Sequence, residues 1–184
     1  DFGPCALSVG NFDGVHLGHR RIFRRVAALA RQRGWRAAAL TFHPHPARVV
    51  APARAPRLLS TPEERAGLMA GEGIEEVLIL PFTEALARLS PEEFVRDVLA
   101  ARLGARAVLV GENFRFGYRQ SGDAAGLRAL GAKYGIEAEV VAPVRVRGWA
   151  TSSSAVRRAI EAGEVARAAR LLDRPYALAG EVVS

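Results

Sequence analysis

Two histidines stand where the first apolar run of the chain gives way to a helical pattern. His16 and His19 follow a turn that contains Gly10 and Gly14. Residues three apart share one face of a helical turn, so both imidazoles can face one ligand. Imidazoles donate hydrogen bonds to phosphate oxygens, and the free N–H groups of a helix start also favour anions. The spacing predicts a phosphate site. A two-histidine metal site is the alternative, but no third ligand is evident nearby.

A second group suited to phosphate lies late in the chain, in segment 151–157. It holds Ser152, Ser153 and Ser154, followed by Arg157. Ser152 or Ser153 would cap a helix, which leaves the other hydroxyls and the helix N–H groups for an anion. Arg157 comes four residues after Ser153, on the same helical face, where it can reach a phosphate oxygen. Capping explains one serine, so the remaining groups predict a second part of the phosphate site.

Alternating apolar runs predict the elements that position these groups. Short β-like runs alternate with amphipathic helical stretches, which implies parallel strands joined by helical crossovers. We therefore expect an α/β, Rossmann-like fold: a mostly parallel five-stranded sheet with helices on both faces and ligands beyond the carboxyl ends of its strands. The predicted strands are 6–9, 37–42, 76–80, 107–110 and 137–141. The predicted helices are 18–33, one starting at 60–64, 90–103, 123–134, 153–162 and 164–172; the proline-rich stretch 43–56 is expected to hold no regular element.

Composition narrows the class of protein. The chain has 184 residues, a net charge of +7 and one cysteine, which excludes an internal disulfide and a cysteine-based zinc cage. No apolar run approaches the ~20 residues of a membrane span. The basic residues are arginines spread along the chain rather than a compact stripe, so neither nucleic acid nor membrane is an expected partner. We expect a soluble, cytoplasmic protein that attracts phosphorylated small molecules.

Five motifs occur in one order and cover nearly the whole chain. They are GNFDGVHLGH (10–19), TFHPHP (41–46), GENFRFG (111–117), SSSAVR (152–157) and LDRPY (172–176). His16-Leu17-Gly18-His19 resembles the HxGH signature of the nucleotidyltransferase superfamily. The ordered set resembles, more narrowly, the FMN adenylyltransferase (FAD synthetase) module of prokaryotic bifunctional riboflavin kinase/FAD synthetase.

This resemblance implies a reaction in which the FMN phosphate attacks the α-phosphorus of ATP in line, giving FAD and pyrophosphate. Mg²⁺ would accompany ATP and bridge its phosphates. His16 and His19 would hold the phosphates and stabilise the departing pyrophosphate, with Arg157 on a β- or γ-phosphate oxygen. The nucleotide site would also include Gly10, Asn11, Phe12, Asp13, Gly14, Ser152, Ser153 and Ser154. Asp13 has an alternative role, as a cap of the following helix.

The resemblance also implies a flavin pocket. Its members would be Phe42, Pro44, His45, Pro46, Phe114 and Phe116. On pattern alone, 43–46 is only a turn that leaves a strand, and one of the two phenylalanines is a core residue. Asn113 would lie at the flavin phosphate, where the family often has Asp. FMN phosphate is largely ionised at neutral pH and needs no general base, so Asn is compatible with the chemistry.

The resemblance gives residues 1–176 as the adenylyltransferase domain, and 177–184 as a linker or the start of a riboflavin kinase domain present in the full-length protein. The kinase residues are absent from this sequence, so we expect no phosphorylation of riboflavin. Two alternatives remain. One is the same chemistry on another acceptor, such as pantetheine phosphate or nicotinamide mononucleotide; the other is a non-catalytic flavin-binding module or an arginine-rich nucleic-acid binder. Asp173 stands where the family usually has Gly.

Overall fold

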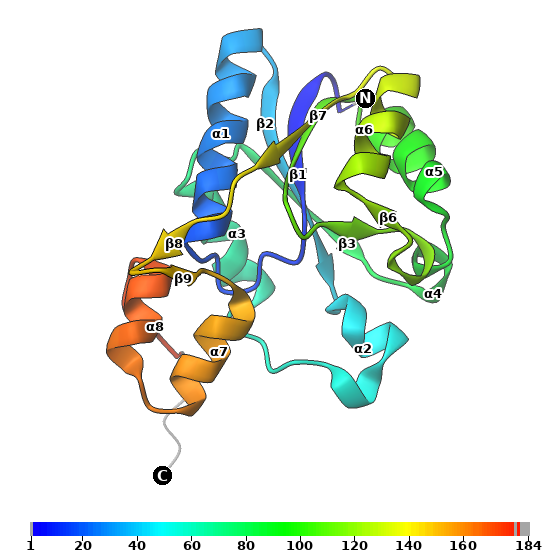
Figure 1. Ribbon diagram of the computed structural model, residues 1–184. Coiled ribbons are helices and arrows are strands. Elements are labelled where there is room, and N and C mark those ends of the chain that lie inside the picture. Colours follow the sequence, from blue (N-terminus) through cyan, green and yellow to red (C-terminus); the bar gives the residue numbers. More distant parts are fainter. Residues whose placement is uncertain (1, 179, 181–184) are drawn as a thin grey trace.

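A single sheet of five parallel strands organises the molecule (Figure 1). The computed structural model describes residues 2–178 and 180. The sheet order is β3-β2-β1-β4-β7, and this confirms the predicted α/β fold. The five strands are β1 (Cys5–Val9), β2 (Arg36–His43), β3 (Glu76–Pro81), β4 (Ala105–Gly111) and β7 (Glu137–Val141). Strand order reverses between β1 and β4, which is where ligands of such sheets bind.

Two layers of helices cover the sheet, one on each face (Figure 1). On one face lie α1 (Leu17–Arg33) and α3 (Pro62–Ala70); on the other lie α5 (Pro91–Glu93), η2 (Phe94–Arg102) and α6 (Ala124–Lys133). Strand β1 serves both cores, because Cys5, Leu7 and Val9 belong to one cluster and Ala6 to the other. The central strand is therefore apolar along almost its whole length.

Helix boundaries follow the capping signals of the sequence. Thr61 and Glu64 form a reciprocal capping box at α3, and Ser90 and Glu93 form another at α5. Gly34 ends α1 in the left-handed conformation at φ 67°. These predicted starts and this stop are confirmed.

Other segments depart from prediction. The stretch 43–56 holds α2 (Pro46–Val50) and the 3₁₀ helix η1 (Pro52–Arg54), so the expectation of no regular element is wrong. The first turn of a helix tolerates proline, which removes no hydrogen bond there. The helix after α5 continues as the π-helix η2. The remaining short elements are α4 (Glu84–Ala87), β5 (Arg115–Phe116), η3 (Tyr118–Gln120), β6 (Gly122–Asp123), β8 (Arg145–Val146) and β9 (Trp149–Ala150).

The last elements form a small unit with a core of its own, here called the C-terminal unit (145–172). It consists of the β8–β9 hairpin, α7 (Ser153–Glu161) and α8 (Val165–Leu172), which lie together below α1 in Figure 1. Val156, Leu171 and Leu172 are buried here against Leu59. This core is separate from those that flank the sheet, so other contacts must hold the unit in place.

Replacing two helical glycines by alanine should change the free energy of unfolding in opposite directions. A Cβ at Gly131 of α6 would lie 2.6 Å from the Ile136 carbonyl oxygen, whereas a Cβ at Gly67 of α3 meets nothing within 4 Å. We expect Gly131→Ala to lower the free energy of unfolding by about 1–3 kcal/mol. Gly67→Ala should raise it by up to about 1 kcal/mol, through helix propensity alone. Urea unfolding of both variants checks the pair, and a stabilising Gly131→Ala contradicts the close approach of α6 to Ile136.

Candidate active site

The loop from Gly10 to His16 joins β1 to α1 and has an uncommon backbone. Phe12, Gly14 and Val15 all have positive φ, at 48°, 76° and 41°. Such conformations cost a non-glycine residue of order 1 kcal/mol and persist only where the surroundings impose them. His16 begins α1, because its Nδ1 accepts a hydrogen bond from the Gly18 N–H at 3.1 Å. The loop therefore carries backbone strain at the start of a long helix.

His16 at the end of this loop and His19 in the first turn of α1 have stacked rings. Their ring centroids are 3.6 Å apart and their planes 23° from parallel. Burial lowers the pKa of His16 to about 4. Burial also lowers the pKa of His19 well below its usual value, and the nearby His16 and Arg65 lower it further. Both rings are therefore neutral at neutral pH, and a neutral imidazole carries one N–H that can donate a hydrogen bond.

The lowered pKa of His16 predicts an acid-sensitive fold. Above pH 6.5 the ring is neutral in both states and contributes nothing; as pH falls from 6.5 toward about 4, only the unfolded chain takes up the proton. This should remove roughly 3 kcal/mol of stability across that window. His16→Asn keeps a capping side chain without the titration. Unfolding free energies should fall less steeply with acid for His16→Asn than for the wild type; parallel curves would contradict the prediction.

Asp13 fixes the middle of the loop. Its buried carboxylate accepts from the Leu59 N–H at 3.0 Å and from the N–H and hydroxyl of Ser60 at 3.1 and 3.2 Å. It also forms an ion pair with Arg157 at 2.5 Å. The cap of α1 is His16, so the alternative of Asp13 as that cap is wrong.

The serine-rich segment 151–157 contacts the loop from Gly10 to His16, although the two are far apart in sequence. Ser152 caps α7 by accepting from the Ala155 N–H, and the Ser153 hydroxyl donates to the Asp13 carbonyl at 2.8 Å. Arg157 bonds the Asp13 carboxylate and the Arg57 carbonyl. Ser154 is exposed. The two expected phosphate-binding segments thus lie side by side, with Arg157 held by Asp13.

Sequence reasoning missed two arginines at this place. Arg174 donates to the carbonyls of Gly14 at 2.7 Å and Val15 at 3.1 Å, which ties the loop to the chain after α8. Arg65 of α3 is only 2% exposed and donates to the Thr41 hydroxyl. Both left a signal: Arg174 lies in the LDRPY motif, and Arg65 stands four residues before buried Met69 on the inner face of its helix.

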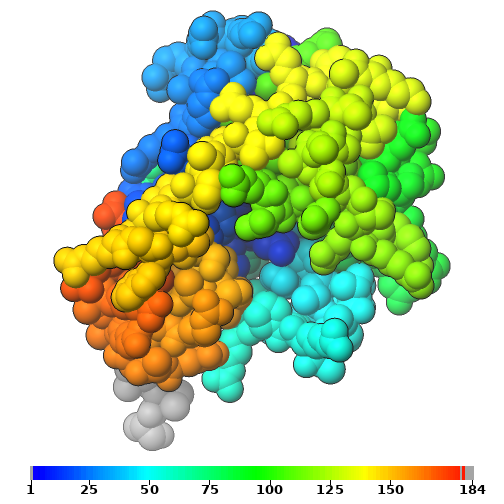
Figure 2. Space-filling view, in the orientation of Figure 1, coloured from blue at the N-terminus to red at the C-terminus, as the bar shows by residue number. Residues whose placement is uncertain are grey.

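A cavity of about 840 Å³ opens beside the loop, at the carboxyl ends of β1, β2 and β4. Figure 2 shows a hollow floored in dark blue by the start of the chain, between the cyan α2 region, the green segment after β4 and the orange α7. Its volume suits a cofactor-sized ligand. Seven of the predicted site residues line it: Gly10, Asn11, Phe42, Pro46, Asn113, Phe114 and Phe116. Phe114 and Phe116 stack at 5.3 Å, and Phe116 is the one buried in the core.

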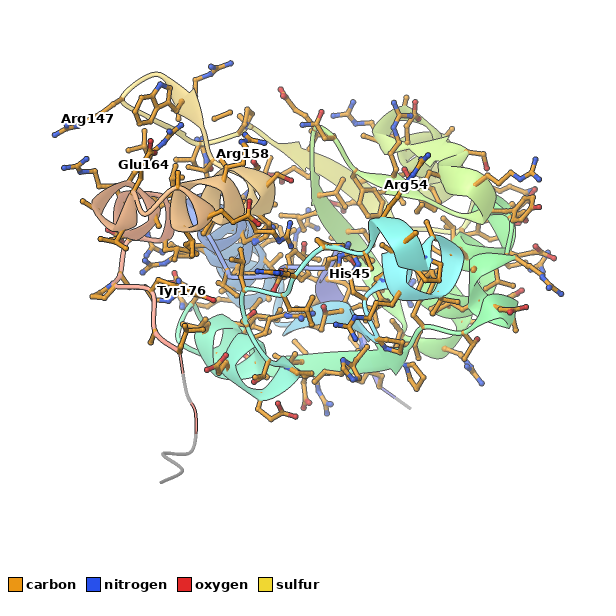
Figure 3. All side chains as sticks on the ribbon, turned by 90° about the horizontal axis from the view of Figure 1, so that it is seen from below. His45, Arg54, Arg147, Arg158, Glu164 and Tyr176 are labelled. Atoms are coloured by element: carbon orange, nitrogen blue, oxygen red, sulfur yellow. The ribbon has the colours of Figure 1, made fainter. Side chains whose placement is uncertain are left out.

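Other predicted residues support this cavity rather than line it. Phe12 is buried with its ring against His19 and Phe23. His45, near the middle of the view in Figure 3, caps α2 through Nδ1, and its Nε2 lies 3.2 Å from the Asn11 amide. Pro44 and His45 lie in the chain between Phe42 and Pro46, which do line the cavity. Pro44 and His45 are absent from the described lining, and so are the predicted phosphate-site residues: Phe12, Asp13, Gly14, His16, His19, Ser152, Ser153, Ser154 and Arg157.

The edge of the cavity carries positive charge. Arg88, Arg115 and Arg119 contribute to its lining, against one carboxylate, Glu84. An anionic ligand suits this balance. Within residues 2–178 and 180, no group of three His, Cys, Asp or Glu side chains is arranged to hold a metal ion. Over the same residues, no helix is both long enough and apolar enough to cross a membrane.

A parallel sheet with paired histidines at the start of α1, beside a cavity where strand order reverses, defines an α/β fold of the nucleotidyltransferase type. A sequence profile described as FAD synthetase matches residues 1–155. The chain belongs to the FAD synthetase family, which confirms the resemblance found in its motifs.

Curated relatives extend this match to nearly the whole chain. Bifunctional riboflavin kinase/FMN adenylyltransferases from Pseudomonas fluorescens and Escherichia coli K12 are 37% and 34% identical to it over 97% of its length. The corresponding protein of Listeria monocytogenes is 35% identical over 96%. The chain spans 57% of the length of the first two relatives and 56% of the third.

Solved structures agree on the fold. One described as a macrolide-efflux protein from Streptococcus pneumoniae superposes with a TM-score of 0.82 at 28% identity, over 95% of this chain and 56% of that one. Pantothenate synthetase from Thermus thermophilus superposes with a TM-score of 0.52 at 17% identity, over 93% of this chain and 75% of that one. The second likeness concerns the fold alone.

Proposed function

We propose that this chain is an FMN adenylyltransferase, which transfers AMP from ATP, bound with Mg²⁺, to FMN. The observation that carries the proposal is the continuity of two sites: Gly10 and Asn11 line the cavity, and the same loop leads directly to His16 and His19. A flat flavin in the cavity would thus present its phosphate toward a nucleotide held at the histidines. Membership of the FAD synthetase family supports this assignment.

In the proposed reaction, an oxygen of the FMN phosphate attacks the α-phosphorus of ATP. The bond between the α-phosphorus and the bridging oxygen breaks, and pyrophosphate leaves. The attacking phosphate is already ionised, so the protein supplies position and charge stabilisation rather than a base. His16 and His19 would donate to the phosphates, with the start of α7 beside them. Asn113, Phe42, Pro46 and Phe114 would hold the flavin end.

We assign residues 1–176 to this activity. The expected linker or kinase start at 177–184 falls mainly on residues 179 and 181–184, which lie outside the described residues. Mg²⁺ belongs to the substrate in this proposal: the Asp13 carboxylate is occupied by Arg157 and the 59–60 backbone, so the metal would be held by ATP phosphates.

The direct test is incubation of the chain with ATP, Mg²⁺ and FMN, followed by chromatography for FAD and a pyrophosphate assay. Equal amounts of FAD and pyrophosphate are expected. Parallel reactions with pantetheine phosphate and nicotinamide mononucleotide should release little pyrophosphate, and riboflavin should give no FMN. Pyrophosphate release with another acceptor but not with FMN would replace the proposed substrate, while flavin binding without ATP turnover would leave a binding module.

A further inference from the structure

Arg65 is a fully buried cation that lacks an ion-pair partner among the residues that the structure covers. It is 2% exposed, and its Nε is buried without a hydrogen-bond partner there. One of its terminal nitrogens donates to the Thr41 hydroxyl at 3.0 Å, and that hydroxyl donates to the Asn11 carbonyl at 3.1 Å. Where a described carboxylate forms a salt bridge, its partner is a cation other than Arg65; Asp13, for example, pairs with Arg157. The Arg65 guanidinium is thus linked to the loop from Gly10 to His16 through one neutral hydroxyl group, that of Thr41.

The surrounding charges leave a positive surplus. Asp13 is the carboxylate that interacts electrostatically with Arg65, but its oxygens are bonded to Arg157 and to residues 59–60. One carboxylate therefore faces two guanidinium groups, and the imidazoles beside them are neutral. A buried charge without a partner is costly, so an arrangement of this kind suits a site that receives an anion.

His19, like Arg65, has a buried nitrogen without a hydrogen-bond partner in the described part of the chain. This nitrogen is Nδ1. A buried N–H without an acceptor is rarer in proteins than an acceptor without a donor, so the proton belongs on Nε2. His16 and Arg65 act electrostatically on this ring, and the rings of Phe12 and Phe23 pack against it. The nearby cation further disfavours a second proton.

We propose that Arg65 is a positioning residue of the nucleotide site: it holds Asn11 through Thr41 and supplies the surplus positive charge behind the loop. Burial keeps His19 neutral, and the charge of Arg65 adds to that effect. The Nε2–H then donates to a phosphate oxygen, and Thr41 transmits the position of Arg65 to Asn11. This inference rests on the proposed function for the identity of its anion, the phosphates of ATP.

Histidine NMR tests the effect of the Arg65 charge on His19 without any turnover. Long-range ¹H–¹⁵N spectra of the four imidazoles distinguish the two neutral tautomers and follow protonation. Wild type should show His19 as one tautomer, protonated on Nε2. Arg65→Met removes the charge at similar length, and His19 should then titrate at a higher pH; Arg65→Lys should restore the wild-type titration. An unchanged His19 titration in Arg65→Met overturns the proposal.

Kinetics test the positioning role of Arg65. Arg65→Met should raise KM for ATP by about 10- to 100-fold, the effect of losing a hydrogen-bonded charge, and leave KM for FMN within a factor of about two. Arg65→Lys should recover most of the affinity. Arg25→Met, which removes the same charge from the exposed face of α1, is the matched control and should change neither constant. Equal rises in both constants indicate a merely structural role and overturn the proposal.

A second variant covers the case in which Arg65→Met does not fold. Thr41→Val is nearly isosteric and removes only the hydroxyl that joins Arg65 to Asn11. It should raise KM for ATP by about tenfold, as expected for one lost hydrogen bond; an unchanged KM overturns the proposal. If wild type forms no FAD, the proposed function fails separately. The Arg65 variants are then compared by calorimetry with inorganic pyrophosphate and by the His19 titration.

Discussion

His19→Ala is expected to lower kcat for FAD formation by at least two orders of magnitude, the usual cost of removing one preorganised donor from a developing charge. The ring is held by His16, Phe12 and Phe23, and its buried Nδ1 leaves Nε2 as the nitrogen for a ligand. Such a donor needs no reorganisation when charge builds on the departing pyrophosphate. Single-turnover FAD formation at saturating ATP and FMN measures the effect on chemistry.

Two other variants separate the lost donor from damage to the fold. His43→Ala makes the same exchange at an exposed histidine and should leave kcat unchanged. His19→Gln retains an N–H donor of similar reach and should keep more activity than His19→Ala. Circular dichroism and thermal unfolding should show that all three variants fold. Undiminished turnover in folded His19→Ala would refute the assigned role.

Asp13→Ala is expected to lower the free energy of unfolding by about 3–5 kcal/mol. The carboxylate is 1% exposed and receives hydrogen bonds from Leu59, Ser60 and Arg157. Its removal leaves a largely buried guanidinium without a counter-charge and two backbone N–H groups without an acceptor. Because the loop also carries positive-φ residues, it should lose its shape and its affinity for ATP together.

Asp97→Ala supplies the control for Asp13→Ala. Asp97 pairs with Arg96 on the exposed face of η2, and its loss should cost less than about 1 kcal/mol. A double mutant adds a sharper criterion: Arg157→Met combined with Asp13→Ala should destabilise less than the sum of the two single changes. Urea unfolding measures all four proteins. A loss in Asp13→Ala no larger than that in Asp97→Ala would show that the pair does not stabilise the loop.

The sheet and most helices could be predicted, because their signals are local. Buried runs such as 107–110 and capping residues such as Thr61 and Glu64 specify elements without help from distant parts of the chain. The order of the loops along the chain then places Gly10, Phe42 and Asn113 at one edge of the sheet, where the structure also has them. Hydrophobic periodicity is enough to predict an element whose boundaries depend only on its own residues.

The rest depends on contacts between distant segments. Strand pairs such as β8 and β9 are two residues long and leave no periodic pattern. Pro46 indicates a break in regular structure, although a helix start tolerates it. The spacing of Arg157 indicates a helical face but not a partner; Asp13, 144 positions away, takes that side chain. Arg65 is hard to predict because arginine is in general a surface residue. Its spacing from Met69 places it on the inner face of α3, but packing is what buries it.

The hydrogen bonds that hold the loop from Gly10 to His16 have a consequence for folding during synthesis. Its partners come from progressively later parts of the chain: Leu59 and Ser60, then Ser153 and Arg157, and finally Arg174, which is 160 positions from Gly14. A ribosome-bound chain that has released the residues up to Ala150 has all five strands of the sheet but lacks the groups that close over the loop. A domain generally folds as a unit, so its last contacts form only when the residues that make them have emerged. The proposed nucleotide site therefore reaches its final geometry only after Arg174 has emerged.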